Sequence, residues 1–171
     1  MRRLLPISVV LALGCTQLPT DNAGVSSAPR LGVNGSDNGT ACVLNTQLRP
    51  ENEVPPTASE AKGHAQIKVR NDGTIEYKVF ILNKAGERFV AGHIHRGVEG
   101  VPGPVVLPLF TGPATNEKHI RQRGEIQSPA ATALGPQLCE HPEMFFVNFH
   151  TVSVPGGTVP GFPGGAIRGQ L

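Results

Sequence analysis

The amino-acid sequence predicts an all-β protein, an antiparallel β-sandwich of about seven short strands. First, the chain of 171 residues contains 21 glycines and 16 prolines, which fall between apolar runs, where turns join strands. Second, several runs alternate polar and apolar residues, which is the two-residue period of a half-buried strand. Third, residues 71–74 contain an Asp-Gly pair, which favours a tight hairpin turn. The length suits a single domain.

Residues 1–14 are expected to be a targeting segment and not part of the fold. Arg2 and Arg3 precede an apolar run at residues 4–13, which is shorter than the roughly 20 residues that span a bilayer. The run ends in Leu-Ala-Leu-Gly followed by Cys15, which resembles the lipobox of bacterial lipoproteins. Such signals are cleaved before the cysteine, which carries the lipid. We therefore expect an exported lipoprotein, periplasmic or at the cell surface, anchored to the membrane at Cys15. The alternative is an ordinary secretory signal with an incidental cysteine.

Residues 15–40 are rich in Thr, Pro, Asn, Gly and Ser and show no apolar periodicity. This composition is typical of a flexible linker, so we expect a tether followed by one domain at residues 41–171. Loss of residues 1–14 removes Arg2 and Arg3, so that the 15 basic residues become 13 and balance the 13 acidic ones. A formally neutral chain shows no sign of the basic stripe that nucleic-acid binding needs, and we expect no nucleic-acid partner.

Two cysteines, Cys42 and Cys139, remain once Cys15 is assigned to the lipid. In an oxidising compartment two such cysteines most simply form one disulfide. The bond would close a loop of nearly a hundred residues, which the chain-entropy model values at up to about 4–5 kcal/mol. Two separate buried thiols are the alternative. Metal binding by these cysteines is less expected, because neither lies in a Cys-x-x-Cys motif.

The first half of the domain is expected to hold strands at residues 42–48, 65–70 and 75–81. A loop with two adjacent prolines, over residues 51–63, separates the first two. The Asp72-Gly73 pair joins the second and third strands as a hairpin. In the third strand, alternate apolar residues share one face, which is expected to be buried.

The second half is expected to hold four further strands, which are residues 89–95, 105–110, 144–152 and 166–171, and residues 124–126 are a candidate for one more in the least readable region, residues 111–129. A Gly/Pro-rich loop over residues 97–104 joins the first two of these. Pro108 lies inside the second, and it favours a position at a sheet edge or strand end, because proline cannot donate a ladder hydrogen bond. One helical turn is expected at residues 130–134.

The main chemical signal is a pair of histidines that flank one aliphatic residue. On a strand, His93 and His95 point to one face and Ile94 to the other, because strand side chains alternate. A later predicted strand carries His150 on its polar face. If both strands bury their apolar faces, the three histidines can converge. Three imidazoles suit a transition metal, and copper or zinc is the expected ion.

The alternative is that His93, His95 and His150 are structural. They could hydrogen-bond across neighbouring strands or to loop backbone, and Asn148 and Thr151 would fit such a supporting polar network. A further alternative is a site for an organic ligand or a partner.

Other polar residues are expected in solvent or against loop backbone and not in a site. They are three histidines, two glutamates and one arginine: His64, His119, His141, Glu51, Glu53 and Arg168. His119 lies among basic residues, which repel a cation. Arg168 shares a strand face with Gln170 and is expected to face solvent.

Five motifs occur in an order typical of one known family. They are Glu53-Val54-Pro55-Pro56, Gly92-His93-Ile94-His95, Gly103-Pro104-Val105-Val106, Val147-Asn148-Phe149-His150-Thr151 and Pro163-Gly164-Gly165-Ala166-Ile167-Arg168-Gly169-Gln170-Leu171. They resemble the CHRD family, a domain named after chordin, where it occurs in repeated copies. The resemblance covers residues 42–171. It implies an extracellular or periplasmic β-sandwich and says little about activity.

The histidine pattern is also similar, locally, to the copper side of copper–zinc superoxide dismutase, another β-sandwich. The sandwich itself is expected to be immunoglobulin-like or superoxide-dismutase-like. A fourth copper histidine and a zinc-binding loop are not recognisable, nor is a Gly-x-Ser-x-Gly elbow or a phosphate-binding glycine loop. We therefore expect a non-enzymatic binding protein with copper or zinc as its ligand. An adhesion or scaffolding module for protein or glycan is the second hypothesis, and a dismutase-like redox enzyme is a distant third.

Overall fold

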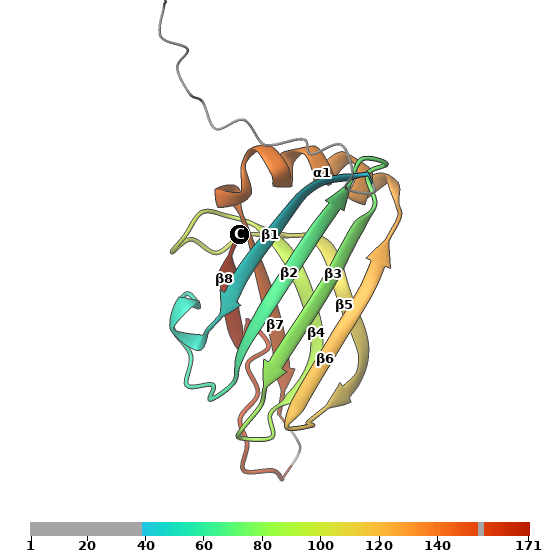
Figure 1. The fold of residues 1–171 in the computed structure, drawn as a ribbon. Coiled ribbons are helices and arrows are strands. Elements are labelled where there is room, and N and C mark those ends of the chain that lie inside the picture. The colour runs from blue at the N-terminus through green and yellow to red at the C-terminus, as the bar shows by residue number, and fades with distance from the viewer. Residues whose placement is uncertain (1–38, 154–155) are drawn as a thin grey trace, which may run out of the picture. The chain divides into compact units, whose positions relative to one another are not determined.

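The computed structural model describes residues 39–153 and 156–171 as a β-sandwich, shown in Figure 1. Eight strands form two four-stranded antiparallel sheets: sheet A has the order β1-β2-β3-β6, and sheet B the order β5-β4-β7-β8. The elements, in chain order, are β1 (Thr40–Leu48), η1 (Pro50–Asn52), β2 (Lys62–Arg70), β3 (Ile75–Leu82), β4 (Arg88–Arg96), β5 (Val105–Thr115), β6 (His119–Ile126), α1 (Pro129–Glu140), η2 (Pro142–Met144), β7 (Phe145–Val152) and β8 (Ile167–Gln170).

Sheet A contains the hairpin that the sequence predicts, formed by β2 and β3. Asp72 holds the turn, because its Oδ1 accepts a hydrogen bond of 2.9 Å from the Thr74 N–H. Gly73 has a φ of +82°, which favours glycine. Along both strands buried side chains alternate with exposed or partly exposed ones. Sheet A therefore has one face in the core and one in solvent.

Sheet B is more deeply buried. Its central strands β4 and β7 are antiparallel neighbours, and the five residues Phe145–Phe149 of β7 are all buried. Because consecutive strand residues point to opposite faces, the outer face of β7 is covered as well as the inner one. β5 is an edge strand of this sheet and contains Pro108, which confirms the position predicted for that proline.

The hydrophobic core lies between the two sheets. Both contribute large apolar side chains that are almost fully buried: Ile67, Ile75, Ile81, Phe89, Ile94, Val147, Phe149 and Ile167. Burial of one such side chain contributes about 1.5–3 kcal/mol. Packing of these side chains holds the two sheets together, and it uses only their inner faces.

Helix α1 is longer than the single turn predicted at residues 130–134. It begins after Ser128, whose Oγ accepts a hydrogen bond of 3.2 Å from the Ala131 N–H, and Pro129 occupies the first helical position. Leu134 and Leu138 are buried in the core. These two contacts carry the helix past the predicted end.

A disulfide joins Cys42 of β1 to Cys139 of α1, as predicted. The two cysteines are 97 residues apart in the chain, so the bond fixes the helix to a strand that is distant in sequence. Disulfides of this kind are typical of extracellular or periplasmic proteins.

The predicted fold class is confirmed, with eight strands where about seven were expected. The predicted strand at residues 124–126 begins earlier, at His119, and the one at residues 105–110 runs on to Thr115. The expected signal segment, Cys15 and most of the expected tether lie outside the described residues. No helix in the described part of the chain is long and apolar enough to cross a membrane.

Candidate metal centre

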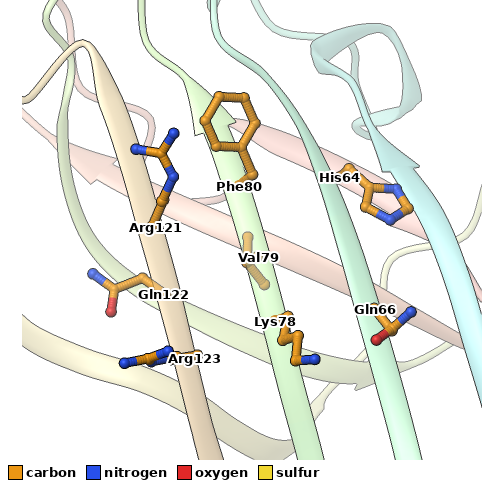
Figure 2. Close-up of a pocket in the computed structure, with 8 residues that line it drawn as sticks. All are labelled: His64, Gln66, Lys78, Val79, Phe80, Arg121, Gln122 and Arg123. Atoms are coloured by element: carbon orange, nitrogen blue, oxygen red, sulfur yellow. The ribbon is translucent and has the colours of Figure 1, made fainter.

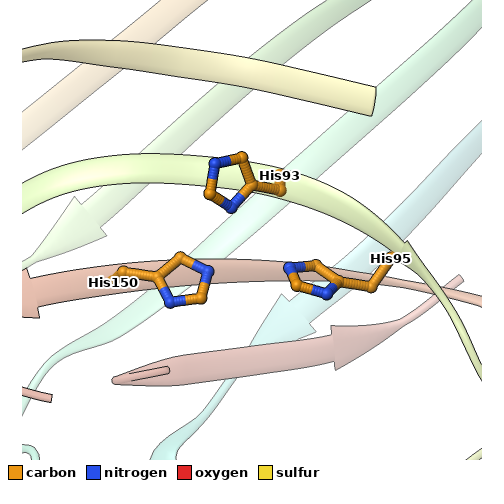
Figure 3. A group of neighbouring side chains, drawn as sticks. All are labelled: His93, His95 and His150. Carbon is orange, nitrogen blue, oxygen red and sulfur yellow. The ribbon is translucent and has the colours of Figure 1, made fainter. Parts of the chain in front are cut away.

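Three histidines gather on the outer face of sheet B. His93 and His95 come from β4 and His150 from β7, and Figure 3 shows their rings side by side. Ile94, between the first two, points into the core and is fully buried, as strand alternation predicts. A register shift between β4 and β7 places Ala91 opposite His150. His150 therefore lies diagonally across from His93.

The rings are close enough to share one ion. The ring centroids are 4.9 Å apart for His93 and His150, 5.6 Å for His93 and His95, and 5.7 Å for His95 and His150. One nitrogen of each ring lies within 4.8 Å of one nitrogen of the other two. Two nitrogens bound to one ion at about 2.0–2.1 Å lie at most about 4 Å apart. Small side-chain rotations would thus close the group around an ion, and the predicted convergence is confirmed.

Backbone carbonyls orient two of the rings. The Nδ1 of His95 donates to the Gly103 carbonyl at 2.9 Å, and the Nδ1 of His150 donates to the Pro163 carbonyl at 3.0 Å. Because a carbonyl oxygen can only accept, the proton is on Nδ1 and the lone pair on Nε2. Both Nε2 atoms, and the Nδ1 of His93, are buried without a hydrogen-bond partner in the described part of the chain. A metal ion bound by these nitrogens would satisfy all three, and an Nδ1–H donated to a carbonyl is typical of metal-binding histidines.

Burial favours the neutral form of these rings. Desolvation is the largest cause that lowers the pKa of each histidine, and the pKa of His150 falls to about 4. Charge repulsion between the rings adds to this effect for His93 and His150, and the nearby charge of Arg168 does so for His95. Neutral imidazole is the form that binds a metal ion. At neutral pH the group can therefore bind an ion without first losing a proton.

Gly103 allows the loop over residues 97–104 to reach His95. A Cβ atom at residue 103 would collide with the carbonyl oxygen of Arg96. The loop closes onto β4 through a hydrogen bond of 3.0 Å from the Arg96 N–H to the Pro104 carbonyl. Only glycine fits this close approach, so the Gly-Pro pair of the sequence motif positions the carbonyl that orients His95.

Arg168 does not face solvent, and the prediction for it is wrong. The side chain is buried, with the whole residue 3% exposed. Its guanidinium donates to the carbonyls of Val101 at 2.9 Å and Val98 at 3.0 Å, and lies 3.4 Å from the centroid of the Phe146 ring. The same ring stacks on His95 at 4.9 Å. Arg168 therefore ties the loop over residues 97–104 to β8 and, through Phe146, supports one ring of the histidine group.

Glu53 is also buried, where the sequence predicts a carboxylate in solvent or against loop backbone. It is 6% exposed, and its Oε2 accepts a hydrogen bond of 3.3 Å from the Asn148 side chain. Burial raises the pKa of Glu53 to about 7, while the charge of Arg168 and the hydrogen bond from Asn148 act in the opposite direction. Asn148 is paired across the sheet with His93 on one side and Arg168 on the other. Glu53 thus contacts the strand position beside the histidines.

Sequence reasoning missed the roles of Glu53 and Arg168 because their partners are distant in the chain. No local period links either residue to Asn148 or to the valine carbonyls. The available signal was that both lie in motifs shared with the family named above.

Thr151 lies apart from the histidines, although the sequence predicts it in their polar network. It is fully buried on the inner face of β7, and its Oγ1 accepts a hydrogen bond of 2.9 Å from the Phe162 N–H. The remaining histidines, His64, His119 and His141, are exposed and lie outside the group, as expected.

Searches among curated proteins and solved structures found no match for this chain. A family model described as the CHRD domain matches residues 44–171. That range holds all of the motifs quoted above, the three histidines, and the buried residues Glu53 and Arg168. The chain therefore belongs to the CHRD domain family.

Proposed function

We propose that this protein binds a transition metal, copper or zinc, through His93, His95 and His150. Two observations carry the proposal. Each of the three rings has one buried nitrogen that lacks a partner in the described residues, and each ring places a nitrogen within 4.8 Å of a nitrogen of the other two. Buried polar atoms without partners are uncommon because each costs about 1–3 kcal/mol. Their concentration at one point favours an ion there over a purely structural network.

The donor set narrows the choice of metal. Imidazole nitrogens suit copper, zinc, iron and nickel, whereas carboxylate and carbonyl oxygens suit magnesium and calcium. The group contains three imidazoles and no carboxylate. Three protein ligands leave one position of a four-coordinate ion for water or another donor. We propose that the protein is a binding protein and not an enzyme, and that lipid at Cys15 holds it at the envelope.

The test is metal content and affinity of the purified protein for copper and zinc. The variant His93→Ala/His95→Ala/His150→Ala is compared with a control that loses three exposed histidines, His64→Ala/His119→Ala/His141→Ala. We expect the wild type and the control to bind one equivalent of metal, and the first variant to lose it.

Two outcomes would contradict the proposal. One is weak metal binding that the two triple variants reduce equally, which would indicate adventitious surface sites. The other is no binding by a folded wild type, together with a loss of stability in the first variant, which would indicate a structural network. Superoxide turnover by the metal-loaded wild type would argue against a role in binding alone.

A further inference from the structure

The domain is almost neutral as a whole, but its charged residues are unevenly distributed over its surface. Residues 41–171 contain 12 Lys and Arg against 11 Asp and Glu. On the outer face of sheet A, however, six basic side chains accompany two glutamates. The basic ones are Lys62, Lys68, Arg70, Lys78, Arg121 and Arg123. This face therefore carries an excess of four positive charges, and the rest of the domain is net acidic.

Strand register gathers part of this charge around one aromatic ring. Phe80 lies directly opposite Arg121, and Lys78 directly opposite Arg123. The Arg121 guanidinium is 5.2 Å from the centre of the Phe80 ring, and Phe80 is 38% exposed. On the other side of β3, His64 pairs with Phe80 and Gln66 with Lys78. Figure 2 shows these side chains on three neighbouring strands, where they line a hollow of about 690 Å³.

The cations in this hollow lack anionic partners. Among the described residues, Glu76 pairs with Lys68 and Arg70, whereas no ion pair involves Lys78, Arg121 or Arg123. Like charges directly opposite each other on a sheet are destabilising, as at Lys78 and Arg123. A bound anion would relieve this repulsion.

We propose that the outer face of sheet A is a binding site for an acidic polysaccharide, a glycan chain with repeated carboxylate, sulfate or phosphate groups. Arg121, Arg123 and Lys78 bind the anionic groups, the Phe80 ring packs against the apolar face of a sugar, and Gln66 hydrogen-bonds hydroxyl groups. A narrow chain needs contact with this face alone, where basic side chains outnumber acidic ones. A membrane surface or a nucleic-acid duplex is wider, and the acidic remainder would repel it.

This site is independent of the histidine group, which lies on the other sheet. The test is the affinity of the purified protein for polygalacturonate, a polymer of uronic acid, with neutral dextran as the comparison ligand. The variant Arg121→Ala/Arg123→Ala is matched by Arg49→Ala/Lys84→Ala, which removes two exposed charges outside this face. The affinity is also measured for duplex DNA and for lipid vesicles with and without phosphatidylglycerol.

We expect polygalacturonate to bind, dextran to bind far more weakly, and salt to weaken the binding. Loss of both arginines is expected to reduce affinity about tenfold or more, because hydrogen bonds to charged groups are strong. The matched control and the variant His93→Ala/His95→Ala/His150→Ala, which changes only the other sheet, should bind polygalacturonate as the wild type does.

Three results would overturn the proposal. The first is equal affinity for dextran and polygalacturonate. The second is unchanged binding by a folded Arg121→Ala/Arg123→Ala variant. The third is tighter binding to duplex DNA or to anionic vesicles than to polygalacturonate, lost in the same variant, which would assign the face to that partner instead.

Discussion

The outer faces of the two sheets are built from similar residues and yet differ in character. On sheet A, Arg123 is exposed and has no ion-pair partner among the described residues. On sheet B, Arg168 is buried under loops and bonded to two backbone carbonyls. The difference is the covering of loops, because a strand by itself places both arginines on a surface. Covered polar groups must find partners inside the protein, whereas uncovered ones remain available to a ligand.

The same contrast applies to the histidines. His64 and His119 lie in solvent on sheet A, and His93, His95 and His150 are at least partly buried on sheet B. Burial lowers the pKa values of the second group and fixes two of its rings on carbonyls. A covered face thus gives histidines that are neutral and, in two cases, oriented by a hydrogen bond to a carbonyl.

The largest difference between the faces is expected for their arginines. Arg168→Met removes the positive charge near Glu53 and three side-chain hydrogen bonds, two to backbone carbonyls and one to Gln170. We therefore expect the free energy of unfolding to fall by about 3 kcal/mol. Arg123→Met should change it by less than about 0.5 kcal/mol. Urea unfolding of both variants measures the difference. Equal losses of unfolding free energy in the two variants would show that burial of Arg168 under the loops of sheet B does not contribute to stability.

A smaller difference is expected for two glycines with positive φ. At Gly165, φ is +139° and a Cβ atom would lie 2.6 Å from the side chains of Asn148 and Glu53. At Gly86, φ is +72° and the surrounding space is open. We expect Gly165→Ala to cost about 2–3 kcal/mol and Gly86→Ala about 1 kcal/mol. Thermal unfolding curves compare them, and a harmless Gly165→Ala would mean that Glu53 is not packed as described.

The pH dependence of stability in the metal-free protein tests the covered face alone. The folded protein keeps His150 neutral down to about pH 4, whereas the unfolded chain takes up the proton below the ordinary pKa of 6.5. This contribution to stability is lost as the pH falls from 6.5 to 4. Glu53 acts oppositely, because its pKa rises from 4.5 to about 7 on folding. Its contribution is present below pH 4.5 and is lost as the pH rises to 7.

Two substitutions separate these contributions. Glu53→Gln should make stability rise more steeply with pH between 4.5 and 7, and His150→Gln should make the rise shallower. Urea unfolding at several pH values in this window, with a chelator present, gives both slopes. Slopes that shift in the same direction would contradict the opposite pKa shifts.

The smallest expected effect is a gain in stability on sheet A. Arg123→Glu replaces a like-charge pair with an attractive one beside Lys78, so we expect a gain of about 0.2–1 kcal/mol. The same change should weaken polygalacturonate binding. Chemical denaturation and a binding titration on one preparation would show both, and a less stable variant would mean that Lys78 and Arg123 do not repel each other.

The strands were predictable because their period is local. Ile75, Tyr77 and Val79 alternate with polar residues, and the convergence of His93, His95 and His150 followed from the same alternation. Helix α1 was largely missed, because Gly135 and Pro136 disfavour a helix and only burial of Leu134 and Leu138 overrides them.

The covered face was less predictable. Arg168 and Glu53 become buried only when the loops fold over sheet B. The sequence next to Arg168 is the same for a strand residue that faces solvent and for one that loops cover, so it does not predict the burial. The basic face of sheet A was missed for another reason. A count of charges along the chain is neutral, and the excess is visible only once β2, β3 and β6 are placed side by side.

The edge strand β5 has a consequence for the behaviour of the folded protein in concentrated solution. Open strand edges can recruit strands from other molecules, which is one route to aggregation and fibres. Pro108 and Pro113 both lie in β5, and neither has an N–H to offer an incoming strand. The prolines therefore act as gatekeepers that keep neighbouring molecules from extending sheet B at this edge.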